Sequence, residues 1–177
     1  AVTVACILLT AGLYLGTKAK ADANELSFAR KAVLDAAGIG YTPTQAGIEQ
    51  AYLANIKESQ GYYETISGDT RYVIELEGPG LWGTITIMAG FESDLTTFSG
   101  LAIVSQNETP GLGARIEEPW FTAQFKGKQA PFVLVEEGTA DSTDEVDSIT
   151  GATRTSEYFR NLANGAAAEA VRIIGRR

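Results

Sequence analysis

The chain begins with a continuous apolar segment, and after it the apolar residues recur at the spacing of a helix. Residues 1–16 carry no charged side chain. As a helix they would extend for about 24 Å, most of a hydrocarbon core of about 30 Å. Apolar residues recur at helical spacing over 25–37, before two glycines, and Pro43 and Thr44 open a second predicted helix that ends near Ile56. The pattern therefore predicts three helical segments before the chain changes character.

Beyond residue 60 the pattern is typical of short β-strands. Turn signals such as Ser67-Gly68-Asp69 separate runs that are rich in β-branched and aromatic residues. The predicted strands are 62–66, 71–77, 83–91, 98–106 and 132–136. A short helix is predicted at 119–125, and the acidic segment 141–147 is predicted to be a solvated loop. Consecutive strands with helices before and after favour an α+β fold, in which an antiparallel sheet is flanked by helices.

The last helix is predicted over 156–174, where apolar residues again recur at helical spacing. Its expected buried stripe consists of Tyr158, Phe159, Leu162, Ala166, Val171 and Ile174.

The apolar N-terminal segment has two interpretations. A secretory signal peptide is common at this position, and Ala19-Lys20-Ala21 resembles an A-x-A cleavage site. We favour a retained transmembrane anchor, and because the chain starts without methionine we expect further apolar residues before Ala1 to complete the span. Lys18 and Lys20 favour a cytoplasmic exit by the positive-inside tendency, but charges before Ala1 would compete with them.

Composition excludes several classes of function. The formal net charge of −8 disfavours nucleic acid as a partner, because phosphate backbones require a basic surface. The sequence contains no histidine and one cysteine, Cys6. A disulfide within the chain, a Cys/His metal cluster and a Ser-His-Asp or Cys-His nucleophile are therefore excluded. Any chemistry must come from carboxylates, hydroxyls, backbone amides or a cofactor.

Hydroxyl-bearing residues surround a Gly-Ala pair just before the last predicted helix. The segment Asp147–Ser156 reads DSITGATRTS, and five of its ten residues carry a hydroxyl. The small residues allow a ligand to approach the backbone, and a helix N-terminus favours a phosphate. A simple N-cap by Thr155 or Ser156 is the alternative. A nucleotide P-loop is excluded because no lysine follows the glycine, and a serine hydrolase is disfavoured without histidine.

Residues Asp147–Thr153 resemble the flavinylation motif D-x-x-[S/T]-G-A-T of a known family. The family is that of the FMN-binding subunits of Rnf-type electron transport complexes and of the sodium-translocating NADH:quinone reductase. Three further segments match family signatures in order: GLWG at 80–83, ETPGLG at 108–113 and FKGK at 125–128. Together with the apolar N-terminus, the resemblance covers most of the chain.

This resemblance implies that FMN is joined to Thr153 by a phosphoester, attached after secretion by a dedicated flavin transferase. Trp82 and Leu112 are the expected apolar platform for the ring, although a tryptophan after Gly-Leu is also common in cores. Glu108 and Thr109 precede a Pro-Gly turn that can bring a side chain and an amide to the ring edge. The full set of expected cofactor-binding residues is Thr153, Thr150, Gly151, Ala152, Thr155, Trp82, Glu108, Thr109, Leu112 and Gly113.

The resemblance also implies a domain organisation and a location. Residues 1–17 are expected to be the transmembrane anchor, 18–60 a helical linker region that packs on the domain, and 61–177 the FMN-binding domain. The expected location is the bacterial inner (cytoplasmic) membrane, with a single span and the soluble domain on the periplasmic side.

The function implied by the resemblance is that of an electron-transfer subunit in an ion-translocating oxidoreductase complex, without substrate turnover of its own. Its expected partners are other membrane subunits and iron–sulfur or flavin subunits. The alternatives are an extracytoplasmic module that holds a phosphorylated ligand reversibly without redox activity, and a structural subunit with a degenerate motif. Gly80-Leu81-Trp82 favours the C subunit of the quinone reductase, whereas the compact length favours the G subunit of Rnf, and the coupling ion is open.

Overall fold

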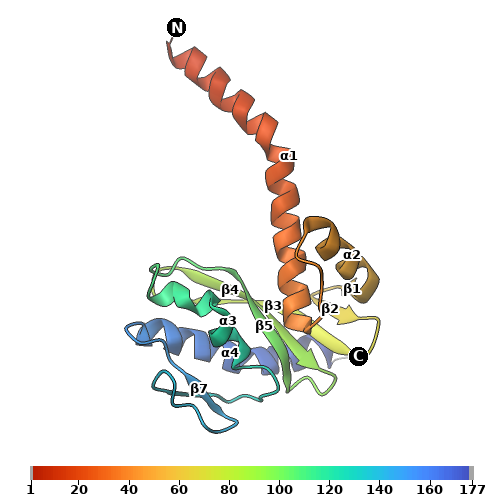
Figure 1. Cartoon of the computed structure of the whole chain (residues 1–177), viewed down its shortest axis with the longest axis vertical. Helices are drawn as coiled ribbons and strands as arrows, with labels where there is room; N and C mark the ends of the chain where they lie inside the picture. Colours follow the sequence, from red (N-terminus) through yellow and green to blue (C-terminus); the bar gives the residue numbers. More distant parts are fainter. Residues whose placement is uncertain (1, 176–177) are drawn as a thin grey trace.

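The fold is built on a five-stranded antiparallel sheet (Figure 1). The structure is a computed structural model, and it describes residues 2–175 without the side chains of Ala5 and Leu8. The elements are, in chain order, α1 (Val2–Ala37), α2 (Gln45–Asn55), β1 (Ile56–Ser59), β2 (Tyr62–Thr65), β3 (Arg71–Pro79), β4 (Thr84–Glu92), β5 (Phe98–Ser105), the 3-10 helix η1 (Gly113–Glu117), α3 (Pro119–Ala123), β6 (Val133–Val135), β7 (Glu145–Asp147) and α4 (Thr153–Ile174). The predicted α+β class is confirmed.

The sheet is a meander with helices on both faces. Its strands are hydrogen-bonded in the order β1-β2-β3-β4-β5, each antiparallel to the next. The end of α1 and α2 cover one face, where they pack against Met88, and α4 covers the other, where it packs against Ile87. Because both faces are covered, nearly every residue of β4 is buried, and successive residues contribute to opposite cores.

Helix α1 is one continuous helix of 36 residues, about 54 Å long at 1.5 Å per residue. It is long and apolar enough to cross a membrane, judged by length and composition. Its first half projects away from the domain and bends about half-way along (Figure 1). Thr17, which follows Gly16, donates a hydrogen bond to the Leu13 carbonyl at 2.8 Å, a contact that commonly bends helices. Residues 2–17 of the apolar segment that was predicted as an anchor and the predicted helix at 25–37 therefore both fall within α1.

The last turn of α1 lies directly on the backbone of the sheet. Gly90 of β4 pairs with Gly100 of β5, and a Cβ atom added at Gly90 would come within 1.9 Å of the Ala36 carbonyl oxygen. The final carbonyls of the helix have no partner within the helix. The Ser99 hydroxyl donates to the Ala36 carbonyl at 2.8 Å, and the Arg71 guanidinium donates to the Ala37 carbonyl at 2.9 Å. The two glycines allow α1 to lie close to the sheet, and the side chains of Ser99 and Arg71 attach it there by hydrogen bonds.

Replacing Ser99 by alanine is expected to destabilise the full chain by about 1–3 kcal/mol, because the buried Ala36 carbonyl would lose its partner. The measurement is urea unfolding in detergent, followed by circular dichroism. Ser142→Ala is the matched control, since that hydroxyl is exposed on a loop, and it should change stability by less than about 0.5 kcal/mol. Equal stability of the two variants would contradict this role of Ser99.

Three elements of the structure were not predicted. The second helix ends at Asn55, next to its predicted end near Ile56, but the unpredicted strand β1 begins at Ile56 and pairs with β2. The acidic segment 141–147 is not all loop: β7 pairs in parallel with β6, and Val146 is buried. Neither β1 nor β7 has the length or the alternation of apolar and polar residues that would allow its prediction from the sequence. The 3-10 helix η1 follows the ETPGLG motif, where no helix was predicted.

The last helix begins three residues earlier than predicted, at Thr153. Its stripe is largely confirmed, because Phe159, Leu162, Ala166 and Ile174 are buried. Tyr158 is only half-buried. The prediction for Val171 is wrong: this residue is exposed, because it lies on the solvent-facing side of α4 while Ala170 and Ile174 on the other side are buried.

Candidate functional site

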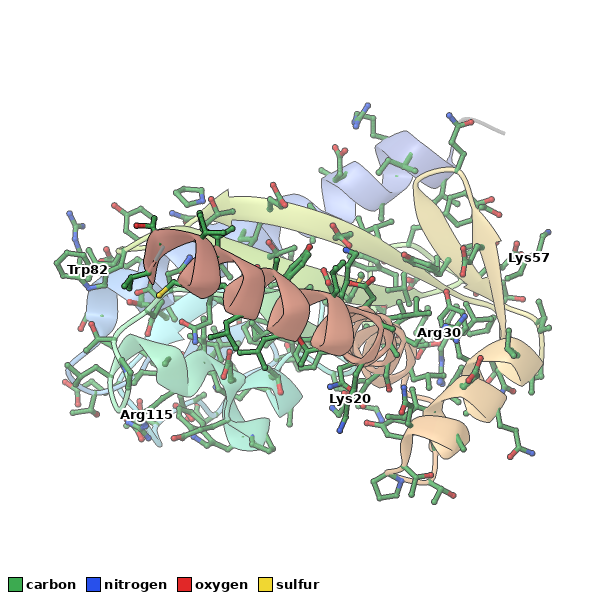
Figure 2. The ribbon with its side chains drawn as sticks, turned by 90° about the horizontal axis from the view of Figure 1, so that it is seen from above. Lys20, Arg30, Lys57, Trp82 and Arg115 are labelled. Atoms are coloured by element: carbon green, nitrogen blue, oxygen red, sulfur yellow. The ribbon has the colours of Figure 1, made fainter. Side chains whose placement is uncertain are left out.

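Three segments meet at one end of the sheet. They are the β3–β4 turn, the loop after β5 and the start of α4, and each holds one of the sequence motifs GLWG, ETPGLG and SITGAT. Figure 1 shows the loops gathered on the left. Seen from above, Trp82 and Arg115 lie at this end of the domain and Lys57 lies at the opposite end (Figure 2). The fold therefore brings together motifs that are far apart in the sequence.

A tight turn leads into α4. Ile149 is fully buried, and the Ala152 N–H donates to the Ile149 carbonyl at 2.9 Å across Gly151. Gly151 has a φ of +81°, which a residue with a side chain rarely adopts. The Ser156 hydroxyl accepts the Ile149 N–H at 2.9 Å and donates to the Ala152 carbonyl at 3.1 Å. The turn is therefore fixed from inside the domain.

The first turn of α4 has no side-chain cap. Ala152 is the N-cap residue, and Thr155 and Ser156 lie within the helix, so the simple capping interpretation is wrong. Both hydroxyls point into the domain, because Thr155 is 1% exposed and Ser156 is 0% exposed. The first N–H groups of the helix consequently remain available for an outside acceptor.

Thr153 is the first helical residue and its side chain is exposed. Within the described residues its hydroxyl makes no hydrogen bond. It lines an open cavity of about 710 Å³ together with Ser148, Glu157, Arg160 and the β6 strand. An external reagent can reach this hydroxyl, and no base among the described residues is hydrogen-bonded to it.

A buried carboxylate joins the three segments. Glu108 is 4% exposed, and its Oε2 accepts the Thr155 hydroxyl at 2.5 Å. Its Oε1 accepts the backbone N–H groups of Leu81 at 2.8 Å and Trp82 at 3.1 Å. A Cβ atom added at Gly113 would come within 2.8 Å of Oε2. Both oxygens of the carboxylate are thus hydrogen-bonded within the protein. A direct contact of Glu108 or Thr155 with a ligand would require the hydrogen bond between them to break.

Apolar side chains are exposed beside the helix start. Leu81 is 47% exposed, Trp82 69% and Leu112 44%. A Cβ atom added at Gly151 would lie 3.2 Å from Leu112 Cδ2, so this leucine lies against the turn that precedes Thr153. The core interpretation of Trp82 is therefore wrong, and its ring faces outward.

Two charged residues that the sequence did not reveal also hold the turn. Glu137 accepts the Thr150 N–H at 2.8 Å and pairs with the Arg115 guanidinium at 2.8 Å. The Arg115 hydrogen bond, followed by the Thr150 N–H, lowers the pKa of Glu137 to about 2. The side chain of Thr150 and that of Thr109 are exposed. Glu137 lies in no motif, and only the folded chain places it beside Thr150.

Glu137→Gln is expected to reduce the pH dependence of stability in acid. The folded-state pKa lies below the ordinary value of 4.5, so the pair contributes stability above about pH 4.5 that is lost as the pH falls through about 2. The check is thermal unfolding of the full chain across this range. Glu25→Gln, an exposed carboxylate on α1, is the control and should retain the parent profile. A parent-like profile for Glu137→Gln would contradict the assignment.

The FKGK segment (125–128) forms a turn that is remote from the start of α4. Gly127 has a φ of +75°, and Lys128 Nζ donates to the Glu145 carbonyl at 2.6 Å. These contacts hold the loop before β7. A second cavity, of about 560 Å³, lies between α1, β5 and α3, and its lining includes Lys126 but none of the expected cofactor-binding residues.

Comparisons with known proteins match the part of the chain that holds these motifs. Residues 80–168, half of the chain, match the family model of the FMN-binding domain. The C subunit of the Na(+)-translocating NADH-quinone reductase of Vibrio anguillarum is 38% identical over 104 residues, which cover 53% of this chain and 41% of that protein. The G subunit of the ion-translocating oxidoreductase complex of Methanosarcina acetivorans is 36% identical over 86 residues, which cover 49% of this chain and 44% of that protein. The chain thus spans about two fifths of the length of these curated relatives.

Solved structures share the fold. The crystal structure of the C subunit of the Na(+)-translocating NADH-quinone reductase from Parabacteroides distasonis superposes with a TM-score of 0.74 at 25% identity, covering 90% of this chain and 98% of that chain. NqrC of Shewanella oneidensis has a TM-score of 0.66 at 18% identity, covering 80% of this chain and 90% of that chain, and it supports the fold alone.

Proposed function

Because the chain belongs to the FMN-binding domain family, we propose that it is a membrane-anchored electron carrier with FMN joined through a phosphoester to Thr153. The observation that carries this proposal is the exposed, unbonded Thr153 hydroxyl at a helix start without a side-chain cap. The phosphate of the ester would accept the free N–H groups of the first turn, and the helix dipole would stabilise its negative charge. Thr150, Gly151 and Ala152 shape the turn that presents this hydroxyl.

The surroundings of Thr153 also fit a flavin ring. A flat aromatic cofactor needs apolar contacts. The exposed Leu112 lies against the turn before Thr153. The exposed Trp82 belongs to the β3–β4 turn, whose backbone Glu108 links to Thr155 of α4. When bound, FMN takes up and releases one or two electrons. The residues of this chain hold and orient it, which agrees with a sequence that has no histidine for acid–base chemistry.

Attachment requires a second protein. Ester formation joins Thr153 Oγ to phosphorus, while the hydroxyl proton leaves and phosphorus loses its bond to the leaving group of the flavin donor. Within the described residues no base contacts this hydroxyl, so a flavin transferase must supply one. The apolar half of α1 supports a single-pass anchor, and the location that we propose is the bacterial inner membrane, with the domain on the periplasmic side.

The proposed partners are the other subunits of an ion-translocating oxidoreductase. Matches to the C subunit of an NADH-quinone reductase and to the G subunit of an ion-translocating complex support a redox role within an assembly of one of these two kinds. In such an assembly the chain would pass electrons between membrane, iron–sulfur or flavin subunits and would not turn over a substrate alone. Mass spectrometry of co-purifying subunits distinguishes the two kinds.

The deciding experiment is mass analysis of the chain purified from its native host. After denaturation, the peptide containing Thr153 should be heavier by FMN less one water, and the band should fluoresce on a denaturing gel. An unmodified peptide from cells that contain a transferase would overturn the proposal. Colour that is lost on denaturation would instead favour reversible binding of a phosphorylated ligand.

A further inference from the structure

The Glu108 carboxylate is buried without a positive partner. Among the described residues no lysine or arginine forms an ion pair with it, and its three hydrogen bonds come from two backbone amides and one hydroxyl. Burying a charge is costly unless hydrogen bonds replace those made by water. The two amides are consecutive and belong to the exposed β3–β4 turn, and the hydroxyl belongs to α4. The carboxylate is therefore the polar link between this turn and the helix that begins at Thr153.

The space around the carboxylate is shaped for it. A Cβ atom added at Gly80 would come within 2.5 Å of Oε1, and one added at Gly113 would come within 2.8 Å of Oε2. Neither position would tolerate a larger residue without moving the carboxylate. The Gly80 N–H also donates to the Gly83 carbonyl at 2.6 Å, which closes the turn over Glu108. Glycines from two different segments thus enclose one side chain.

Trp82 depends on this link for its position. Its side chain is 69% exposed, so packing cannot fix the orientation of the ring. Its backbone N–H, and that of Leu81, are held by Glu108 Oε1. The same carboxylate holds Thr155, two residues after Thr153 on the same helix. One residue therefore sets the place of the exposed aromatic relative to the attachment point.

We infer that Glu108 is a positioning residue that fixes the Leu81–Trp82 turn against the start of α4. The inference rests on the proposed function in one respect, because the turn that is positioned is the one that would flank the flavin. Glu108 acts through Trp82 and Thr155, and it does not touch the cofactor. The link itself exists in the flavin-free chain, where it can be tested separately.

The first test is amide hydrogen exchange in the flavin-free full chain, measured by NMR in detergent. In Glu108→Ala, the Leu81 and Trp82 amides should exchange about tenfold faster or more, as expected for loss of a hydrogen bond to a charged group. Core amides of β4 should exchange at parent rates. In Glu108→Gln the side-chain oxygen can still accept a hydrogen bond, so the exchange rates of Leu81 and Trp82 should lie between those of the parent and of Glu108→Ala. Parent-like exchange at Leu81 and Trp82 in Glu108→Ala would overturn the inference.

A variant with a smaller perturbation covers the case in which Glu108→Ala fails to fold. Thr155→Val keeps the shape of the side chain and removes only the donor to Oε2. It should raise exchange at Leu81 and Trp82 by less than Glu108→Ala would, but by more than Thr150→Val, whose side chain is exposed. Equal rates in the Thr155 and Thr150 variants would also count against the link.

The second test uses the flavin-loaded chain. The sequence has two tryptophans, so a Trp120→Phe background leaves Trp82 as the only indole. Flavin near Trp82 should quench its emission, and Glu108→Ala should restore emission with the flavin content unchanged. If the parent carries no flavin, the proposed function fails while the exchange test still decides the role of Glu108. If flavin is present and Glu108→Ala leaves quenching unchanged, the inference is wrong.

Discussion

Thr153→Ala is expected to yield a folded chain without covalently bound flavin. The side chain is exposed and makes no hydrogen bond among the described residues, so its removal should change stability by less than about 0.5 kcal/mol. It also removes the only hydroxyl at the first helical position, so the ester cannot form there. The readout is in-gel flavin fluorescence after denaturation, in a host that contains the transferase, with loss of the entire signal expected.

Two neighbouring variants make this result specific. Thr150→Ala also removes an exposed hydroxyl, but it keeps the hydrogen bond that the Thr150 backbone N–H donates to Glu137. It should keep most of the covalent flavin. Thr153→Ser retains a hydroxyl at the same position and should keep some. Undiminished fluorescence in Thr153→Ala, or its loss in Thr150→Ala alone, would move the attachment point to another residue.

Gly90→Ala is expected to have the largest effect on stability, about 3 kcal/mol or more. The new Cβ atom would lie 1.9 Å from the Ala36 carbonyl oxygen and 2.6 Å from the Ser99 hydroxyl. The carbonyl belongs to the helix backbone, so relieving this clash would move the end of α1 away from the sheet. Thermal unfolding of the full chain in detergent measures the loss. Limited proteolysis should also cleave the chain near residue 38 faster than in the parent.

Gly40→Ala is the matched control for this change. A Cβ atom at Gly40 would meet no atom within 4 Å, and its φ is not positive, so the substitution should be neutral or slightly stabilising. If Gly90→Ala unfolded at the same temperature as Gly40→Ala, the close approach of the helix to β4 would be incorrect.

The sequence predicted the elements whose signals are local. The β-branched and aromatic residues of 71–77 and 83–91 and the helical spacing in 156–174 are local features of the sequence, and these segments are present as β3, β4 and α4. The strand β7 was missed because a three-residue strand carries no periodicity of its own, whereas its partner β6 lies within the predicted strand 132–136. The continuity of α1 was also missed, because the polar residues between 18 and 24 interrupt the apolar pattern without breaking the helix.

The site shows the same division. The motif at 147–153 was readable because its small residues and hydroxyls are adjacent in the sequence. The link between Glu108 and Thr155 was not, because the two residues are 47 positions apart and meet only when α4 packs on the sheet. Glu137 is likewise 13 positions from Thr150. Sequence proximity therefore indicated the attachment point, whereas the contacts that orient it required the structure.

The docking of α1 decides how a redox partner can reach the cofactor. A domain on a flexible tether would sample a volume set by the length of its linker, and its effective concentration at each partner would follow from that search. Here no linker separates the apolar helix from the sheet. If this helix is the proposed anchor, it would therefore hold the domain at a constant height above the bilayer and in one orientation. Under the proposed function, electrons must be exchanged by neighbours that are already in reach or that move themselves.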